Sequence, residues 1–282
     1  MTARIIDGKK IAAGIREKLK QKIAALPSAP QLAIVLVGND EPSLIYVRNK
    51  QKAAAQIGLP SQLHHLDENI SEEELLKIIA QLNADSEING IIVQLPLPKH
   101  LNTNRIINAI SPLKDVDGFH PYNTGMLQNN EKPYFIAATP LGVMQLIRSV
   151  SPNLSGKNVV LIGASLIVGR PLATLLLNQE CTVSITHAQT RKIKELTSKA
   201  DILVAACGVA KLVKADWIKE NAILIDVGIN RENGKLCGDI DFEDVKEKAL
   251  AITPVPGGVG PMTIAMLLSN TVDAYLLHHP GL

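Results

Sequence analysis

The sequence predicts an α/β protein built from parallel sheets that are covered by helices. Short β-branched runs alternate with longer amphipathic stretches along the chain, which is typical of repeated βαβ units. Apolar residues make up 46% of the chain and aromatic residues only 3%. An interior of Ile, Leu, Val and Ala is typical of a parallel sheet buried on both faces. At 282 residues, the chain is long enough for two domains, each with its own core.

The first half of the chain carries the pattern of one α/β domain. Apolar runs at residues 32–37 (LAIVLV) and 90–95 (GIIVQL) predict buried strands, and a weaker run, QLHHL, lies between them. A helical pattern covers residues 46–56. A second helix is expected to begin at Ser71, because Ser71 and Glu74 have the spacing of a capping box.

The second half predicts a separate sheet. Residues 115–140 are rich in Asn, Gly and Pro and have no clear periodicity, so we interpret them as the hinge between two domains. After the hinge, apolar runs predict strands at residues 158–163, 182–186, 202–207 and 223–228, each followed by a turn or a helix.

The end of the chain is expected to rejoin the first domain. A final apolar helix, from about residue 262 to residue 277, follows the Gly- and Pro-rich segment TPVPGGVGP, where the chain can cross back. We therefore expect one domain from residues 1–120 plus 262–282, and a second domain from residues 138–255.

Charge and cysteine usage restrict the classes of function. The 29 basic and 27 acidic side chains give a net charge of +2 and form no long blocks, so we expect no field that would hold a nucleic-acid backbone. Cys181, Cys207 and Cys237 are far apart and form no CxxC pair, which argues against a disulfide framework and against a zinc site. We expect no bound metal.

Nothing in the sequence indicates a membrane or a secreted protein. No apolar run reaches the roughly 18 residues that a membrane span needs. The N-terminus, MTARIIDGKKIA, lacks the charged, apolar and small-residue regions of a signal peptide. We expect a cytoplasmic protein.

A glycine-flanked turn in the second half has the context of a dinucleotide site. The strand NVVLIG runs into GASLIVGRP, and a helix is expected to open at about Val168, where its N-terminal amides would hold a pyrophosphate. The pattern is loose, because a strict GxGxxG would have glycine in place of Ser165 and Val168. Taken alone, the turn is equally consistent with a tight connection between a core strand and a core helix.

The end of the following strand favours NADP over NAD. A NAD site usually has a carboxylate there that accepts a hydrogen bond from the ribose 2′-hydroxyl. Residues 186–191 contain no carboxylate, and Thr190 or Arg191 could contact a 2′-phosphate. Arg191 is equally consistent with a solvated charge in the first turn of a helix.

Tyr46 and Lys50 are four residues apart on the first predicted helix and therefore lie on the same face. An aromatic ring and a titratable amine would then line one cleft. Most helical lysines are solvated surface charges, so the spacing alone assigns no catalytic role to Lys50.

Polar residues also occur where strands end. Gln94 interrupts an apolar strand end before Leu-Pro-Leu-Pro, which places its amide at the carboxyl edge of the sheet, where α/β proteins bind ligands. An edge glutamine bonded to backbone is the alternative. For Asp117, in KDVDGFHP, the simplest interpretation is an Asx-type turn cap, and His120 is interpreted as a loop histidine.

Taken together, these segments resemble one family, the bifunctional methylenetetrahydrofolate dehydrogenase/methenyltetrahydrofolate cyclohydrolases. The resemblance extends over the whole chain and rests on six ordered segments: YVRNKQKAAAQIG, IIVQLPLP, KDVDGFHPYN, SGKNVVLIGASLIVGRP, ILIDVGIN and TPVPGGVGPMT. It implies a homodimer whose folate lies in a cleft between an N-terminal catalytic domain and a Rossmann-type NADP-binding domain, with the final helix returning to the first domain.

The resemblance also implies roles for individual residues. Tyr46 stacks on the aminobenzoyl part of the folate, Lys50 is the central catalytic group, Gln94 hydrogen-bonds Lys50, and Asp117 anchors the pterin. Further substrate contacts are expected from Val47, Arg48, Asn49, Val93 and Leu95, and from the turn Pro256, Gly257, Gly258, Val259 and Gly260, which closes over the substrate. Cofactor contacts are expected from Gly163, Ala164, Ser165, Thr190, Arg191 and Ile229.

Several positions depart from the pattern of the family. Ala164 occupies a position that is arginine in some relatives, and Ala188 one that often carries a polar or basic contact to the 2′-phosphate. Four further positions differ from the usual residues: Met126, Ala138, Leu141 and Leu166. None of these changes removes a proposed catalytic group, but they keep a preference for NAD open as an alternative.

The implied chemistry has two steps. A hydride leaves the methylene carbon that bridges N5 and N10 for the nicotinamide, which demands no strong protein base. Water then adds to the methenyl carbon and the ring opens to 10-formyltetrahydrofolate, so protons must move between water and nitrogen. We hypothesise that Lys50 moves them, with its pKa lowered towards neutrality by partial burial and with Gln94 orienting it.

Three alternatives are open. A dehydrogenase for a hydroxy acid or an amino acid, with a related two-domain architecture, would not require Tyr46, Lys50 and Gln94 together. A catalytically silent folate or nucleotide sensor would not require an intact set of Lys50, Gln94 and Asp117. Within the family, the alternative is a member that has only one of the two activities or that prefers NAD.

Overall fold

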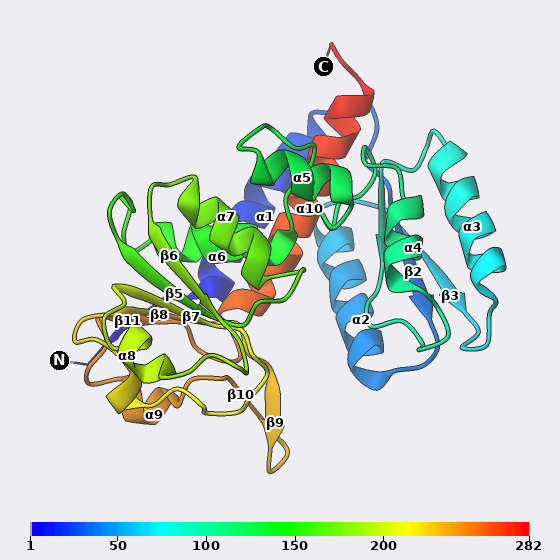
Figure 1. Cartoon of the computed structure of the whole chain (residues 1–282). Coiled ribbons are helices and arrows are strands. Elements are labelled where there is room, and N and C mark those ends of the chain that lie inside the picture. The colour runs from blue at the N-terminus through cyan, green and yellow to red at the C-terminus, as the bar shows by residue number, and fades with distance from the viewer. Residues whose placement is uncertain (1, 282) are drawn as a thin grey trace. The chain divides into compact units, whose positions relative to one another are not determined.

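The structure, a computed structural model, describes residues 2–281, which form two compact units. The first unit contains residues 14–138 and 264–281, and the second contains residues 2–13 and 139–263. Both units have the predicted α/β architecture, with parallel sheets covered by helices (Figure 1).

The first unit is built on a three-stranded parallel sheet in the order β3-β2-β4. Its strands are β2 (Leu32–Val37), β3 (Ser61–Leu66) and β4 (Gly90–Val93). Helices α3 (Glu72–Ala84) and α4 (Thr103–Ala109) cover one face of this sheet, and α2 (Glu41–Gln56) lies on the opposite face (Figure 1). All of β2 is buried, as a continuous apolar run in a covered parallel sheet requires.

Ser71 begins α3 as the sequence predicts. Its hydroxyl accepts a hydrogen bond from the Glu74 backbone N–H at 3.2 Å, and the Glu74 carboxylate accepts one from the Ser71 N–H at 3.1 Å. The predicted capping box is therefore confirmed, and its role is structural.

The second unit contains a six-stranded parallel sheet in the order β1-β11-β8-β7-β5-β6. Its strands are β1 (Arg4–Ile5), β5 (Asn158–Ile162), β6 (Thr182–Thr186), β7 (Ile202–Ala205), β8 (Ile223–Asp226) and β11 (Ala251–Ile252). From the central β5, the chain goes first to β6 on one side and then to β7 on the other. The sheet therefore has a topological switch point at the carboxyl end of β5, and such points are where α/β proteins bind ligands.

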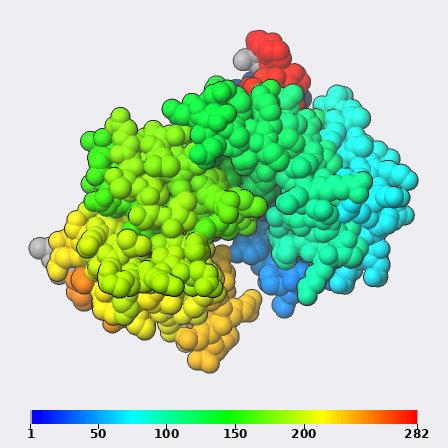
Figure 2. Space-filling model, in the orientation of Figure 1, coloured from blue at the N-terminus to red at the C-terminus, as the bar shows by residue number. Residues whose placement is uncertain are grey.

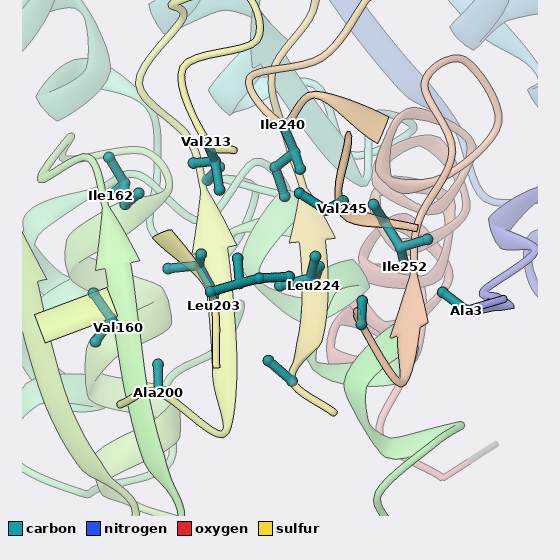
Figure 3. Close-up of a cluster of buried hydrophobic side chains, with 14 residues drawn as sticks. Ala3, Val160, Ile162, Ala200, Leu203, Val213, Leu224, Ile240, Val245 and Ile252 are labelled. Atoms are coloured by element: carbon teal, nitrogen blue, oxygen red, sulfur yellow. The ribbon is translucent and has the colours of Figure 1, made fainter. Parts of the chain in front are cut away.

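Short helices cover the two faces of this sheet. Helices α6 (Ala138–Arg148) and α7 (Gly169–Leu177) lie on one side, and α8 (Ile193–Thr197), the 3-10 turn η1 (Ala215–Trp217) and α9 (Phe242–Val245) lie on the other (Figure 1). Aliphatic side chains from alternate strand positions, such as Val160, Leu203, Leu224 and Ile252, form one buried cluster with Val245 of α9 (Figure 3). Ile193 of α8 packs against this cluster. A hairpin of β9 (Asn230–Glu232) and β10 (Lys235–Cys237) projects from this unit (Figure 2).

Two long helices contribute residues to both units. They are α1 (Gly8–Ala24) and α10 (Val259–His278). Residues 264–281 cluster with the first unit, so the predicted return of the C-terminal helix is confirmed. Asn270 of α10 donates hydrogen bonds to the backbone oxygens of Val116 at 2.8 Å and Ile136 at 2.9 Å, which anchors the returning helix there.

The structure differs from the sequence prediction at several places. The segment 115–140 is not irregular throughout, because residues Pro121–Gln128 form α5, with His120 as its N-cap and Pro121 in its first turn. The expected first domain of 1–120 also differs from the first unit, because residues 2–13 cluster with the second. The two-residue β1 pairs in parallel with β11, a contact between chain ends that no local pattern predicts.

Within residues 2–281, no helix combines the length and apolar character that a membrane span would need. The same residues contain no group of three or more His, Cys, Asp or Glu side chains placed to hold a metal ion.

Candidate functional site

Helix α2 carries Tyr46 and Lys50 on one face. Asp40 caps the helix, and its carboxylate accepts hydrogen bonds from the Ser43 N–H at 3.0 Å and from the Ser43 hydroxyl at 2.7 Å. Lys50 is only 8% exposed, so it departs from the solvated surface lysine that is the usual occupant of a helix. Tyr46 is half-buried, and burial raises the pKa of its hydroxyl above the usual value.

Lys50 contacts Gln94, as the resemblance to the family implies. The Lys50 Nζ donates a hydrogen bond to the Gln94 Oε1 at 3.1 Å. The Gln94 Nε2 in turn donates to the Leu95 backbone oxygen at 2.7 Å, which fixes the amide so that its oxygen faces the lysine. Gln94 follows β4 directly, at the carboxyl edge of the first sheet. A lysine of α2 and an amide of the sheet edge therefore form one polar group.

Asp117 belongs to the same group. It lies on the turn after the Lys114–Asp115 segment, whose Lys114 oxygen accepts a hydrogen bond from Ile91 of β4 at 2.7 Å. Burial raises the pKa of the Asp117 carboxyl, and the positive charge of Lys50 acts in the opposite direction. The charge of Lys50 therefore acts on the Asp117 carboxyl, while Lys50 and Gln94 are joined directly by a hydrogen bond.

Asp115 is a structural residue of this site that sequence reasoning missed. Its Oδ2 accepts hydrogen bonds from the His120 N–H at 2.8 Å and the Asn123 Nδ2 at 3.0 Å, and its Oδ1 accepts one from the Phe119 N–H at 3.2 Å. Burial raises the pKa of Asp115 to about 7 in spite of these donors. The turn cap expected of Asp117 is therefore Asp115, which leaves the Asp117 carboxyl available.

The other expected substrate residues of the first unit have different environments. Val47 and Val93 are each 1% exposed and belong to the interior, so their side chains can serve the site only by packing behind it. Arg48 and Asn49 are exposed, and Leu95 is half-buried beside Gln94. The structure thus joins Lys50 to Gln94 by a hydrogen bond and places Asp117 within range of the Lys50 charge.

In the second unit, the expected cofactor turn lies at the switch point of the sheet. Gly163 follows β5 with a φ of +120°, and a Cβ at this position would lie 2.1 Å from the Ala206 oxygen after β7. A Cβ on Gly169, the first residue of α7, would lie 2.1 Å from the Gly163 oxygen. Only glycine therefore permits this approach of strand, turn and helix.

Ser165 shapes the helix start within this turn. Its Oγ accepts hydrogen bonds from the backbone N–H groups of Val168 at 3.2 Å and Gly169 at 3.3 Å. Ala164, beside it, is half-buried, while Ser165 itself is exposed. The opening of the helix at about Val168 agrees with the structure, in which α7 begins at Gly169.

The remaining cofactor candidates follow neighbouring strands. Thr190 follows β6, and its Oγ1 accepts a hydrogen bond from the His187 N–H at 2.9 Å. Arg191 is exposed, and no acidic residue occurs between Thr186 and Arg191. Ile229 follows β8, and its apolar side chain is 49% exposed. The surface at the carboxyl end of β6 therefore carries a basic residue and no carboxylate, and the surface after β8 carries an exposed apolar side chain.

The Pro- and Gly-rich turn before α10 is also held in place. The Gly257 oxygen accepts a hydrogen bond from the Lys9 N–H at 2.9 Å, and a Cβ on Gly8 would lie 1.9 Å from the Gly258 oxygen. Val259 is buried at the start of α10, and Pro256 is exposed. The start of α1 thus fixes the position of this turn.

Asp226 is a second buried carboxyl that sequence reasoning missed, although it ends the apolar run ILID much as Gln94 ends its strand. Its Oδ1 accepts hydrogen bonds from the N–H groups of Gly228 at 3.0 Å and Asp239 at 2.9 Å, and its Oδ2 accepts one from Ile240 at 2.9 Å. Burial raises its pKa to about 7, against the effect of these donors.

This raised pKa predicts a pH dependence of stability. Because the folded state binds the proton more tightly than the unfolded state, the contribution of Asp226 is complete below about pH 4 and is lost as the pH rises through about 7. The full contribution of this pKa shift to the free energy of unfolding is at most ~4 kcal/mol.

Unfolding followed by the fluorescence of Trp217, the single tryptophan, reports on this unit. The stability of the wild type relative to Asp226→Asn should fall between about pH 4 and about pH 7 and should stay constant above that range. Parallel pH profiles would contradict this assignment.

Two sequence models of one family match the chain. The model described as the catalytic domain of tetrahydrofolate dehydrogenase/cyclohydrolase matches residues 6–117. The model described as the NAD(P)-binding domain of tetrahydrofolate dehydrogenase/cyclohydrolase matches residues 137–279. The two matched ranges lie on either side of the segment 115–140 that the sequence predicts to be the hinge between two domains.

Individual relatives agree with these matches. The bifunctional protein FolD of Bacillus pumilus is 54% identical over 278 residues, which cover 97% of this chain and 98% of the relative. The crystal structure of the bifunctional FolD methylenetetrahydrofolate dehydrogenase/cyclohydrolase from Campylobacter jejuni has a TM-score of 0.95 at 48% identity and covers 96% of this chain and 98% of that one. The Trypanosoma brucei enzyme, solved with NADP cofactor and an inhibitor, has a TM-score of 0.95 at 35% identity over 100% of both chains.

Proposed function

The chain belongs to the tetrahydrofolate dehydrogenase/cyclohydrolase family, and we therefore propose that it carries both activities in one-carbon metabolism. It oxidises 5,10-methylenetetrahydrofolate to 5,10-methenyltetrahydrofolate with NADP, and it hydrolyses that product to 10-formyltetrahydrofolate. The observation that carries the proposal is the hydrogen bond of 3.1 Å between the buried Lys50 and Gln94, with the Asp117 carboxyl close enough for its pKa to respond to the charge of Lys50.

The hydrolytic step needs a group that moves protons. Water adds to the methenyl carbon, the bond from that carbon to N5 breaks, N5 takes up a proton, and one proton is released in total. Lys50 is the group at this site that can pass a proton between the water and the folate nitrogen. Gln94 accepts a hydrogen bond from the Lys50 amine and so fixes the orientation of the amine. The Asp117 carboxyl stabilises the positive charge of Lys50. We propose that Asp117 also anchors the pterin by hydrogen bonds.

The remaining substrate contacts are proposed from the family. The half-buried ring of Tyr46 offers a face on which an aminobenzoyl group can stack. Two groups of residues complete the proposed substrate-binding set: Val47, Arg48, Asn49, Val93 and Leu95 of the first unit, and the turn Pro256, Gly257, Gly258, Val259 and Gly260 of the second unit.

The second unit has the features that a bound NADP requires. The Gly163 turn meets the start of α7 at the switch point of the sheet, and side-chain-free backbone there allows a pyrophosphate to approach the helix amides. Gly163, Ala164, Ser165 and Ile229 would hold the dinucleotide, and Thr190 and Arg191 would hold its 2′-phosphate. When bound, NADP accepts the hydride from the methylene carbon. The contribution of the chain is to hold two ligands in reactive geometry.

A direct assay tests this function. Purified protein is given methylenetetrahydrofolate with either NADP or NAD, and the methenyl and 10-formyl products are measured. We expect both products and a kcat/KM for NADP at least about tenfold above that for NAD, because the end of β6 has a basic residue and no carboxylate. Equal or better use of NAD would overturn the cofactor assignment. Turnover of only a hydroxy acid or an amino acid, or of nothing, would overturn the function.

We propose that the protein is a homodimer and that β3 forms part of the interface. β3 is the edge strand of the first sheet, and its outer side has no neighbouring strand among residues 2–281. The opposite edge is different, because β4 is covered by the bridge between Ile91 and Asp115. An uncovered six-residue edge strand is a template for pairing with a second chain.

The direction of the β3 backbone allows a selective test of this interface. The Pro60 oxygen accepts a hydrogen bond from the Leu32 N–H of β2, and the Leu66 oxygen accepts one from the N–H of Gly38, directly after β2. In a parallel ladder of this register, the N–H of Leu63 points outward. Leu63→Pro removes that donor and leaves the bonds to β2 in place. We expect Leu63→Pro to elute as a monomer in gel filtration with light scattering, whereas Leu63→Val remains dimeric. A dimeric Leu63→Pro protein would exclude this edge from the interface.

We propose a cytoplasmic location with this function. Cys181, Cys207 and Cys237 are all free thiols, which fits a reducing compartment. The folate and NADP chemistry proposed for the chain fits the same compartment.

A further inference from the structure

A buried carboxylate, Asp239, connects the loops that follow β7 and β8 in the second unit. Its side chain is fully buried. Its Oδ2 accepts hydrogen bonds from the backbone N–H groups of Cys207 at 2.7 Å and Gly208 at 3.0 Å. Its Oδ1 accepts one from the Asn230 Nδ2 at 2.8 Å. One side chain therefore holds the backbone after β7 and a side chain after β8.

Asp226 determines where Asp239 lies. Its carboxylate accepts from the backbone N–H groups of Asp239 and Ile240, each at 2.9 Å. The glycines around the pair leave no room for other side chains. A Cβ on Gly228 would lie 2.1 Å from the Asp239 Oδ1, and a Cβ on Gly238 would lie 1.8 Å from the Asp226 Oδ2. The two carboxylates and the backbone around them thus form a single rigid arrangement.

The loops held by Asp239 border the switch point of the sheet. Cys207 and Gly208 follow Ala206, whose oxygen makes the close approach to Gly163. Ile229, with its exposed side chain, lies between Gly228, which is bonded to Asp226, and Asn230, which is bonded to Asp239. Both flanks of the proposed cofactor contact Ile229 are therefore fixed by buried carboxylates.

Burying a carboxylate costs folding free energy unless its oxygens accept hydrogen bonds. Well-packed apolar residues in its place would stabilise the fold at least as much as the carboxylate does. What a carboxylate provides here is a single acceptor for three donors from two separate loops. We propose that Asp239 is a positioning residue for the dehydrogenase half-reaction, which holds the loops after β7 and β8 in the conformation that binds the nicotinamide half of NADP. This inference rests on the proposed function. Asp239 needs no contact with either ligand for this role.

A positioning role of Asp239 predicts that substitutions there impair the dehydrogenase activity and spare the cyclohydrolase activity. Asp239→Ala leaves three donors without an acceptor, so both loops should relax. We expect the KM for NADP to rise at least about tenfold, with a lower kcat for hydride transfer. Hydrolysis of methenyltetrahydrofolate needs no hydride acceptor, and Lys50, Gln94 and Asp117 belong to the other unit. Cyclohydrolase turnover should therefore stay within about twofold of wild type.

The hydrogen bond to Asn230 allows a reciprocal test. Asn230→Asp places two carboxylates where the structure has a bond of 2.8 Å, so it should impair NADP binding as Asp239→Ala does. In the double variant Asn230→Asp/Asp239→Asn, the amide introduced at position 239 can donate to the carboxylate introduced at position 230, while its oxygen still accepts from Cys207 and Gly208. We expect this double variant to recover most of the affinity for NADP.

The matched control is Asp241→Asn, two residues away. Asp241 forms an ion pair with Lys214 at 2.9 Å and should leave both activities unchanged when it is neutralised. Loss of NADP affinity in Asp239→Ala and Asn230→Asp, with rescue in the double variant and retained cyclohydrolase turnover, supports the inference. An unchanged KM for NADP, equal loss of both activities, or no rescue overturns it.

The outcome also separates this inference from the proposed function. If the wild-type protein reduces no NADP with methylenetetrahydrofolate, the proposed function fails, and the positioning role fails with it. If the wild type is active and Asp239→Ala binds NADP normally, only the positioning role fails. Should Asp239→Ala not fold, the comparison of Asn230→Asp with the double variant decides the question.

Discussion

Replacing Lys50 by Met is expected to abolish cyclohydrolase turnover while folate still binds. Methionine fills much of the space of the lysine side chain but has no proton to donate or accept. A positioned acid or base contributes between about 100-fold and about 10,000-fold to such a step, so kcat for the conversion of methenyltetrahydrofolate should fall within that range. The binding surface is retained, because Tyr46, Gln94 and Asp117 are unchanged.

The measurement combines stopped-flow hydrolysis with folate binding by calorimetry. Lys52→Met is the matched control, because Lys52 is an exposed lysine of the same helix and should be dispensable. Full hydrolytic activity of Lys50→Met rules out the role of Lys50. A loss of folate affinity as large as the loss of kcat would assign Lys50 to binding in place of catalysis.

Gly169→Ala is expected to remove dehydrogenase activity and to spare cyclohydrolase activity. The added Cβ would lie 2.1 Å from the Gly163 oxygen, and the clash is with backbone, so the turn or α7 must move. Such overpacking costs up to about 3 kcal/mol of folded-state stability, which is relieved when the turn moves. If NADP binding has to restore the wild-type turn against this cost, kcat/KM for NADP should fall by up to about 100-fold. The chemistry of Lys50 lies in the other unit and should continue.

Gly14→Ala is the matched control for this substitution. It makes the same chemical change inside α1, where a Cβ meets nothing within 4 Å, and it should stabilise the helix by ~1 kcal/mol without changing either activity. Steady-state kinetics with NADP and with methenyltetrahydrofolate provide both readouts. If Gly169→Ala oxidises methylenetetrahydrofolate at the wild-type rate, the turn at Gly163 does not hold the cofactor.

The buried strands could be predicted from the sequence because their signal is local. The run LAIVLV coincides with β2 (Leu32–Val37), which is buried throughout, since a continuous apolar run is what a covered parallel strand requires. The β-branched run TVSIT coincides with β6 (Thr182–Thr186), which lies at the edge of its sheet and, contrary to the prediction, is mostly not buried. Helix α5 was missed because its start depends on His120 and Pro121 and not on a repeating apolar face. β1 was missed because its partner β11 lies far away in the sequence, near the other end of the chain.

Part of the candidate site could be predicted in the same way. Gln94 stands out because a polar residue ends an apolar strand, and Tyr46 and Lys50 share a helix face by spacing alone. The sequence could not predict that Asp115 caps the turn and that the Asp117 carboxyl stays available. Both residues lie in one short turn, and only their burial and the backbone donors around them distinguish them. The contact of Asp239 with Cys207 joins residues 32 positions apart through a carboxylate, which leaves no periodic signal.

The crystal structure of the protein with a bound tetrahydrofolate analogue tests the central claim most directly. We predict that the Lys50 amine lies within hydrogen-bond distance of the nitrogen-bearing bridge of the folate, with the Tyr46 ring against the aminobenzoyl group and Asp117 on the pterin. A folate bound elsewhere, with Lys50 and Gln94 making no contact with it, would contradict the proposed active site.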